Sequence, residues 1–218
     1  MRKRFKVAIS ILAMVVGIFF LVSPTEASFW VKGMGFHYSP DYGDLGDGLE
    51  KAAPRYETPK KLEFGSGTAF SAGYDFSENW GIRLDTFSFT GVADYHHLHL
   101  VDAFYFKTST SPVLLSAVYR VPSRGELYPY LGAGIGSFPS KLTITSNIYE
   151  GAHYTDSPTG FQVLAGAEFR LGDGLFFSGE LRYLSAKAEY PGYRCIESGS
   201  TDWSGVFISL GLGYRFGL

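Results

Sequence analysis

Three features of the sequence predict an all-β fold, an eight-stranded antiparallel transmembrane β-barrel. They are alternating apolar side chains, an amino-terminal export signal, and connections that are either long or very short. The alternation is clearest in residues 206–218, where every even position is apolar and most odd positions are small or polar. A soluble sheet would need a second layer to cover that apolar face, whereas lipid covers it in a membrane barrel.

Residues 1–27 have the layout of a cleavable signal peptide. Basic side chains at the start precede an uncharged apolar run at 7–22, and Thr25-Glu26-Ala27 then offers small residues to a signal peptidase. An uncleaved anchor is the alternative, but the apolar run is short for a spanning helix. We therefore expect export and a single barrel domain at residues 28–218.

The charge of the chain argues against a nucleic-acid partner. Removing residues 1–27 takes away basic side chains more than acidic ones, so the formal net charge of −2 becomes more negative. Cys195 is the single cysteine and cannot form an internal disulfide. We interpret it as incidental.

Eight strands are expected in chain order, and the facing of the first is uncertain because its alternation is imperfect. The fourth is long enough to project beyond a membrane, and Pro112 marks an interruption or bulge in it. The expected strands are 28–38, 62–76, 80–89, 101–121, 128–138, 160–170, 175–187 and 203–218.

The connections sort into two kinds. The long polar loops are 39–61, 91–100, 139–159 and 188–202, and the short turns are 77–79, 122–127 and 171–174. Long extracellular loops and short periplasmic turns are typical of outer-membrane barrels. The sequence therefore predicts a cell outer-membrane location with the loops outside.

The strand parities gather charged side chains inside the barrel. Because the interior of eight strands is only wide enough for side chains or one small ligand, and buried charges must be paired, we expect a plugged lumen. Arg215 is the last inward charge, and we expect it to pair with a carboxylate such as Glu63 or Glu180. The predicted lumen charges are Glu63, Arg83, Asp85, Arg120, Glu168, Arg170, Glu180, Arg182 and Arg215.

Two segments carry a family resemblance. Residues 112–136, SPVLLSAVYRVPSRGELYPYLGAGIG, and the closing segment 206–216 resemble small outer-membrane barrels of the OmpA/OmpW type, the OmpW-like group above all. The resemblance implies contact with outer-membrane lipid and lipopolysaccharide and insertion by the barrel-assembly machinery. It also implies a barrel that binds or passes small hydrophobic molecules through its wall, without a cofactor.

Three polar clusters could each form a metal or catalytic site, but an interpretation as polar residues without such a role is favoured for each. His96, His97 and His99, near Asp94 and Asp102, could chelate a metal, but a polar loop explains them better. The acidic positions Asp41, Asp44, Asp47 and Glu50 recur every third residue, which does not suit a calcium loop. His153, Asp156 and Ser157 could serve a lipid-modifying enzyme, but no nucleophile motif flanks them.

Two alternatives to a hydrophobic-molecule channel stay open: a structural or adhesive surface barrel, and a lipid-modifying enzyme. An apolar cleft among residues 91–105 and 139–159 would favour transport. An unbroken hydrogen-bonded wall around a charge-filled lumen would favour the structural role. A preorganised histidine, serine and carboxylate at the rim would favour the enzyme.

Overall fold

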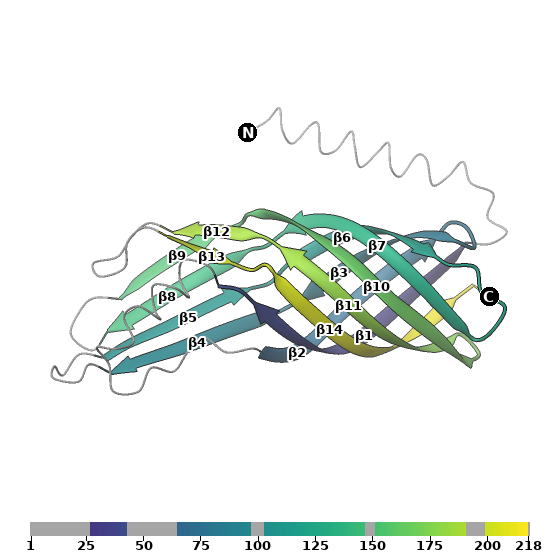
Figure 1. Ribbon diagram of the computed structural model, residues 1–218, viewed down its shortest axis with the longest axis horizontal. Helices are drawn as coiled ribbons and strands as arrows, with labels where there is room; N and C mark the ends of the chain where they lie inside the picture. The colour runs from purple at the N-terminus through teal and green to yellow at the C-terminus, as the bar shows by residue number, and fades with distance from the viewer. Residues whose placement is uncertain (1–26, 43–64, 97–102, 147–150, 191–198, 218) are drawn as a thin grey trace, which may run out of the picture.

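The described residues form a closed antiparallel β-barrel, as predicted. The computed structural model describes residues 27–42, 65–96, 103–146, 151–190 and 199–217. Around the barrel the strands follow the order β1-β14-β11-β10-β7-β6-β3-β2, and β1 closes the ring by pairing with both β14 and β2 (Figure 1). These strands are β1 (Ser28–Pro40), β2 (Gly65–Asp75), β3 (Trp80–Phe87), β6 (Val113–Arg120), β7 (Leu127–Ser137), β10 (Thr159–Gly172), β11 (Leu175–Ser185) and β14 (Gly205–Phe216).

Short connections lie at the end of the barrel where the described chain begins and ends, which we call the turn end (Figure 1). The tightest joins β10 to β11, where Gly172, Asp173 and Gly174 have φ values of 111°, 46° and 82°. Positive φ is disfavoured for most residues and easy for glycine, so the Gly-Asp-Gly sequence suits this hairpin. The predicted turn at 171–174 is confirmed.

Six further strands continue past the barrel at the opposite end, the loop end (Figure 1). β4 (Phe89–His96), β5 (Ala103–Thr110), β8 (Ser140–Ser146) and β9 (Ala152–Asp156) pair in the order β4-β5-β8-β9. β12 (Lys187–Tyr190) and β13 (Gly199–Asp202) form a separate two-stranded sheet.

The prediction of loops throughout 91–100, 139–159 and 188–202 is therefore wrong for their described parts, and 97–100, 147–150 and 191–198 lie outside the described residues. In 139–159 and 188–202 the error came from serine and threonine, which resemble loop composition but also suit strands. In β8 the sequence SKLTITS alternates, with Leu142 and Ile144 buried and Lys141 and Thr145 exposed.

The interruption predicted at Pro112 is confirmed. β5 ends at Thr110 and β6 begins at Val113, so the two residues between them belong to neither strand. The backbone N–H of Ser111 instead donates to the carbonyl oxygen of Pro139, 3.1 Å away. The long strand is thus interrupted at proline but keeps a backbone hydrogen bond to the neighbouring segment.

Outward positions of the barrel strands form an apolar belt. Leu210 is 59% exposed and Leu131 56% exposed, although both lie in the middle of long strands. Because large apolar side chains do not line the outside of a soluble sheet in this density, the belt is a lipid-facing surface. Within the described residues no helix is long and apolar enough to cross a membrane.

We predict that Leu210→Arg destabilises the folded barrel in lipid by about 2–4 kcal/mol, because it places a cation near the middle of the belt. The measurement is the free energy of unfolding in urea after refolding into liposomes. Thr90→Arg is the matched control, since Thr90 is exposed on β4 beyond the barrel, and a change within about 0.5 kcal/mol is expected there. Equal effects of both substitutions would contradict the lipid-facing assignment.

Candidate functional site

The lumen has two unlike halves. Toward the turn end lies an ion-paired layer, which holds every charged side chain that is buried in the described part of the chain: Lys32, Asp75, Arg83, Asp85, Arg120, Glu168, Glu180, Arg182 and Arg215. Toward the loop end lies an aromatic chamber, a cluster of buried apolar side chains that includes Phe36, Tyr38, Phe87, Phe89, Phe106, Leu114, Phe138, Leu184, Trp203 and Phe207.

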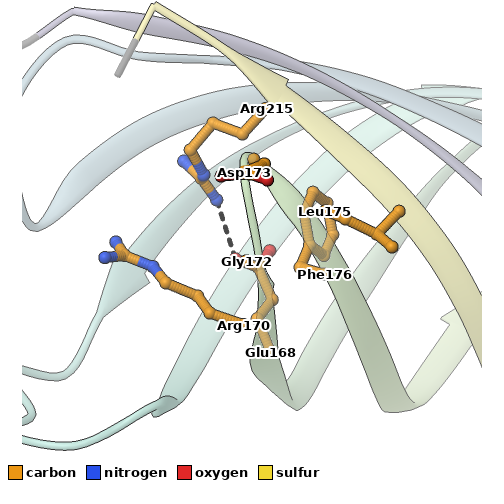
Figure 2. Close-up of a pocket in the computed structure, with 8 residues that line it drawn as sticks. Glu168, Arg170, Gly172, Asp173, Leu175, Phe176 and Arg215 are labelled. Carbon is orange, nitrogen blue, oxygen red and sulfur yellow. Dashed lines mark hydrogen bonds and ion pairs between the residues drawn. The ribbon is translucent and has the colours of Figure 1, made fainter.

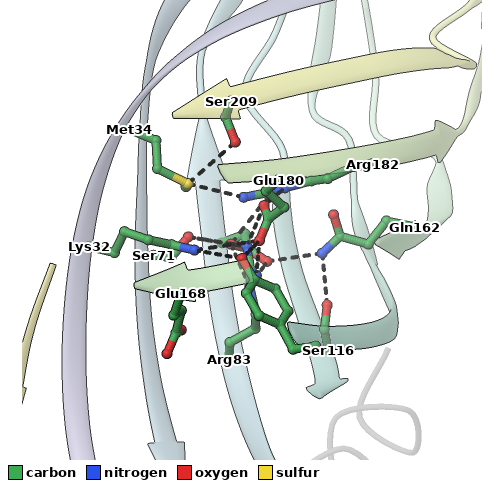
Figure 3. A network of polar contacts seen from close by, with 12 residues as sticks. Lys32, Met34, Ser71, Arg83, Ser116, Gln162, Glu168, Glu180, Arg182 and Ser209 are labelled. Atoms are coloured by element: carbon green, nitrogen blue, oxygen red, sulfur yellow. Dashed lines mark hydrogen bonds and ion pairs between the residues drawn. The ribbon is translucent and has the colours of Figure 1, made fainter. Parts of the chain in front are cut away.

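Glu180 on β11 is the central carboxylate in the part of the ion-paired layer nearer the loop end (Figure 3). Arg83 Nη1 donates to Glu180 Oε2 at 2.5 Å, and Tyr130 OH donates to the same oxygen at 2.7 Å. Lys32 Nζ lies 3.4 Å from that oxygen, and Arg182 Nε donates to Oε1. Four donors on four different strands, β1, β3, β7 and β11, therefore meet one carboxylate.

Asp85 on β3 is the second anion at this level. Arg83 Nε donates to both of its oxygens, at 3.0 and 2.9 Å, and Arg182 Nη1 lies 3.4 Å from Oδ1. Gln162 Nε2 donates to Oδ2 at 3.0 Å, and Ser71 Oγ donates to Oδ1. Because Arg83 contacts both Asp85 and Glu180, the two carboxylates form one network across the barrel.

A second group of four charges lies closer to the turn end. Arg120 Nη1 is 2.5 Å from Asp75 Oδ1, and Arg215 Nη2 donates to Glu168 Oε2 at 2.7 Å. Arg215 Nη1 also donates to Asp75 Oδ2. Two cations and two carboxylates thus pair completely. Arg215 faces the lumen, but its partners are Asp75 and Glu168, so the prediction of Glu180 as its partner is wrong; Glu63 lies outside the described residues.

One predicted lumen residue does not join the layer. Arg170 has inward parity but is exposed at the turn end, where its guanidinium stacks 4.1 Å from the centre of the Tyr128 ring. It reaches away from the Arg215–Glu168 ion pair and lines a small rim pocket of about 90 Å³ (Figure 2). That volume suits a few water molecules, since ligand pockets are usually several times larger.

The sequence reasoning missed two members of the layer. Lys32 was overlooked because Phe29, Trp30 and Val31 blur the alternation of the first strand, so its facing could not be assigned. Asp75 was overlooked although its odd parity matches the inward face of 62–76. Consistent use of the period-two rule in that strand would have found Asp75.

The aromatic chamber is held together by ring contacts around Phe207 on β14. The Phe207 ring stacks on Phe36 with centroids 4.5 Å apart, and it lies 5.0 Å from Phe87 and 6.0 Å from Tyr38. Tyr38 contacts Phe89 in turn, at 5.1 Å, in an edge-to-face arrangement. Such pairs add about 0.5–1.5 kcal/mol each beyond the burial of their surface.

Arg182 lies at the boundary between the two halves. It pairs with Phe207 in the β11–β14 register, and its guanidinium lies 4.8 Å from the centre of the Phe207 ring. Its Nη2 donates to Met34 Sδ at 3.5 Å, and Met34 belongs to the aromatic chamber. The floor of the chamber is therefore a cationic side chain.

Beyond the barrel the wall has two seams, between β2 and β4 and between β9 and β12. Neither pair shares a backbone ladder among the described residues. At the β9–β12 seam, Glu189 N donates to Asp156 Oδ2 at 2.9 Å, and the rings of Tyr154 and Tyr190 lie 6.4 Å apart. Burial raises the pKa of Tyr190 to about 12, with nearby Asp156 acting in the same direction, so its phenol stays neutral.

The segments in which a cleft would have favoured transport do not separate. β5 and β8 pair from Phe104↔Ser146 to Thr110↔Ser140, so the described parts of 91–105 and 139–159 share one continuous sheet. The seams lie instead at the outer edges of that sheet. At the β2–β4 seam the Phe89 ring covers Gly65, where a Cβ atom would come within 2.1 Å of Cε2 of that ring.

The structure does not assemble the enzyme-like cluster. His153 is exposed and its Nδ1 lies 3.2 Å from Thr143 Oγ1, whereas Asp156 accepts from the backbone N–H groups of Ser157 and Glu189. No group of three or more potential metal ligands occurs within the described ranges. His97, His99, Asp102 and Cys195 lie outside those ranges, as do Asp44, Asp47 and Glu50.

We predict that Glu180→Gln destabilises the barrel by about 3–5 kcal/mol, because it leaves Arg83 and Arg182 with an uncompensated buried charge. Urea unfolding in liposomes measures the effect. Glu126→Gln, in an exposed turn, is the control and should change the stability by no more than about 0.5 kcal/mol. A loss below about 1 kcal/mol for the Glu180 variant would show that the barrel does not depend on the Glu180 carboxylate for its stability.

The fold is shared with solved outer-membrane proteins. OprG from Pseudomonas aeruginosa is 16% identical with a TM-score of 0.57, and the match covers 89% of this chain and 98% of that chain. A major outer membrane protein from Thermus thermophilus is 13% identical with a TM-score of 0.54, over 87% of this chain and 99% of that chain. Escherichia coli outer membrane protein W is 13% identical with a TM-score of 0.50, over 89% of this chain and 100% of that chain.

Sequence comparison gives the family. No curated protein sequence matches the chain. The family described as the outer membrane protein beta-barrel domain matches residues 11–216, almost the whole chain. With the closed barrel, the lipid-facing belt and the ion-paired lumen, this match establishes that the chain belongs to the outer membrane protein beta-barrel domain family and is an outer-membrane protein.

Proposed function

We propose that this barrel takes up small hydrophobic molecules at its loop end and releases them sideways into the membrane. The observation that carries the proposal is the division of the lumen, in which the aromatic chamber lies toward the loop end and the ion-paired layer toward the turn end. In an outer membrane the short turns face the periplasm, so the chamber lies on the extracellular side. A molecule that enters the chamber from outside therefore meets aromatic side chains first and charges second.

The ion-paired layer supports sideways release. A molecule moving straight through would have to part Arg83 from Glu180 and Arg215 from Glu168, whose atoms are 2.5 and 2.7 Å apart. Breaking one such buried pair is worth about 3–5 kcal/mol, and an apolar molecule offers nothing in exchange. The direct route to the periplasm is closed to it.

The seams support an exit through the wall. Elsewhere the barrel strands are joined by continuous backbone ladders, which open only with the loss of several hydrogen bonds. At the β9–β12 seam no backbone ladder joins the described residues, and a bond from Glu189 N to Asp156 Oδ2 bridges the two strands. Separating the two sheets there breaks fewer backbone hydrogen bonds than separating two barrel strands.

A structural or adhesive barrel is the second candidate, and one observation favours it. Tyr38, Trp203 and Phe207 have no exposed surface, so the chamber is packed like the core of a soluble domain. On that account the aromatic side chains only stabilise the extension. Binding of an apolar molecule separates the two candidates, because a rigid core would not admit one.

The remaining features of the proposal follow from export and the membrane setting. We propose that residues 1–27 are removed on export, that the barrel-assembly machinery inserts the chain, and that lipopolysaccharide surrounds its extracellular side. We propose no enzymatic activity, since His153 and Asp156 bond to other groups.

The test is entry of N-phenyl-1-naphthylamine, an apolar dye that fluoresces in lipid, into cells with an intact lipopolysaccharide leaflet. Cells that carry the wild-type barrel should take up the dye several times faster than cells without it. Cells that carry an unrelated eight-stranded barrel at equal abundance control for general leakiness. Equal rates in all three would overturn the transport proposal and leave the structural role.

We predict that Asp156→Ala speeds entry of the dye several-fold, because it removes the acceptor that bridges β9 and β12. Asp41→Ala is the control, since Asp41 is an exposed carboxylate that borders no seam of the four-stranded sheet. Both variants should keep the heat-modifiable gel mobility of a folded barrel. An unchanged rate for Asp156→Ala would exclude the β9–β12 seam as the exit.

A further inference from the structure

We propose that the chamber is a binding site for amphipathic anions, with the head group on Arg182 and the apolar tail among the rings above it. The ligand class is an aliphatic or aromatic carboxylate, not a purely apolar hydrocarbon. This inference rests on the proposed function, because it specifies which hydrophobic molecules the chamber prefers. Three observations support the inference: the unused donors of Arg182, the excess of buried cations around it, and the position of the Met34 sulfur.

Arg182 is a buried guanidinium with donor capacity left over. Its side chain has no exposed surface. Nε donates to Glu180, but Nη1 has no hydrogen-bond partner and lies only within ion-pair distance of Asp85, at 3.4 Å. Nη2 is held by a thioether, which is a weak acceptor. A buried donor without a good acceptor is costly, so this arginine favours a ligand that supplies one.

The charge balance around Arg182 favours an anion. At this level Lys32, Arg83 and Arg182 face two carboxylates, Asp85 and Glu180, so the buried cations outnumber the anions by one. The group nearer the turn end is balanced, with Arg120 and Arg215 against Asp75 and Glu168. One added negative charge would therefore neutralise the group around Arg182. Because the group is buried, the electrostatic attraction of that charge is stronger than it would be in water.

Met34 shows where the head group would lie. Its sulfur accepts from Arg182 Nη2 at 3.5 Å and from Ser209 Oγ at 3.6 Å, so two donors converge on one position (Figure 3). Methionine is unbranched and changes rotamer easily, which makes it the side chain that can move aside. A carboxylate in that position would accept from both donors with a full charge.

The surroundings decide where the tail goes. Phe207 covers one face of the Arg182 guanidinium, and Phe36 and Phe87 of the aromatic chamber pack on Phe207 in turn. A tail that continues from the head group can therefore stay in apolar surroundings only by pointing toward the loop end. Head and tail then match the two halves of the lumen.

The test compares three eight-carbon probes, octanoate, 1-octanol and octylammonium, binding to the full barrel in lipid nanodiscs, with empty nanodiscs subtracted. We expect octanoate to bind about tenfold to a hundredfold more tightly than octanol, the range for a hydrogen bond to a charged group. Octylammonium should bind most weakly. In Arg182→Gln the preference for octanoate over octanol should disappear, while octanol binding stays within about twofold.

Two controls keep the outcome clear. Arg120→Gln also removes a buried arginine, but from the group near the turn end, so it should keep the octanoate preference. Met34→Leu removes the thioether that accepts from Arg182 and should tighten octanoate binding, and weaker binding would contradict the position given to the head group. Heat-modifiable mobility shows whether each variant is folded, and if Arg182→Gln fails to fold, the wild-type preference between octanoate and octanol decides.

The outcomes separate this inference from the proposed function. Octanol binding as tight as octanoate, or an octanoate preference that survives Arg182→Gln, would overturn the anion site and leave uptake of hydrophobic molecules intact. Binding of none of the three probes would overturn the proposed function as well.

Discussion

The arrangement of the barrel depends on one constraint, which is that charges removed from water must find partners. Eight strands enclose a lumen too narrow for a water column beside large side chains. Among the described residues five buried cations and four buried carboxylates share this space, and each carboxylate contacts at least two cations. Removing a carboxylate such as Glu180 would leave an excess of buried positive charge in a medium of low dielectric constant.

This constraint also explains why the lumen is divided. The charges occupy the part of the barrel that the apolar belt surrounds, where their ion pairs tie strands far apart in the sequence, such as β3 to β11. Beyond the belt the wall continues as two separate sheets, and the interior there is filled by aromatic rings. The same side chains that hold the extension together supply an apolar surface, and Arg182 is the point where the two kinds of interior meet.

Much of the fold was predictable because alternation in a barrel has only two outcomes, lipid or lumen. The outward Leu210 and the inward Glu180 both follow from parity alone. Parity cannot say which charges touch, because pairing depends on the stagger of the strands around the barrel. Arg215 was therefore assigned the correct face and a wrong partner, and Arg170 was assigned to the lumen although its strand extends past the layer to the exposed rim.

The chamber was harder to predict than the layer, for a physical reason. Its residues come partly from segments such as SKLTITS, whose threonines and serines resemble a polar loop, and partly from Phe207 and Phe87 at inward positions of barrel strands. An apolar residue at an inward position looks like an exception in a single strand. Only the closed barrel shows that these exceptions gather at one end.

The most direct test of a lumen closed by paired charges is ion conductance of the purified wild-type barrel in planar lipid bilayers in concentrated potassium chloride. If the layer fills the lumen, the inserted protein gives no steady unitary current, because ions have no aqueous path past Arg83, Glu180 and Arg215. Long-lived open channels from correctly folded protein would show a continuous water-filled pore and contradict the account.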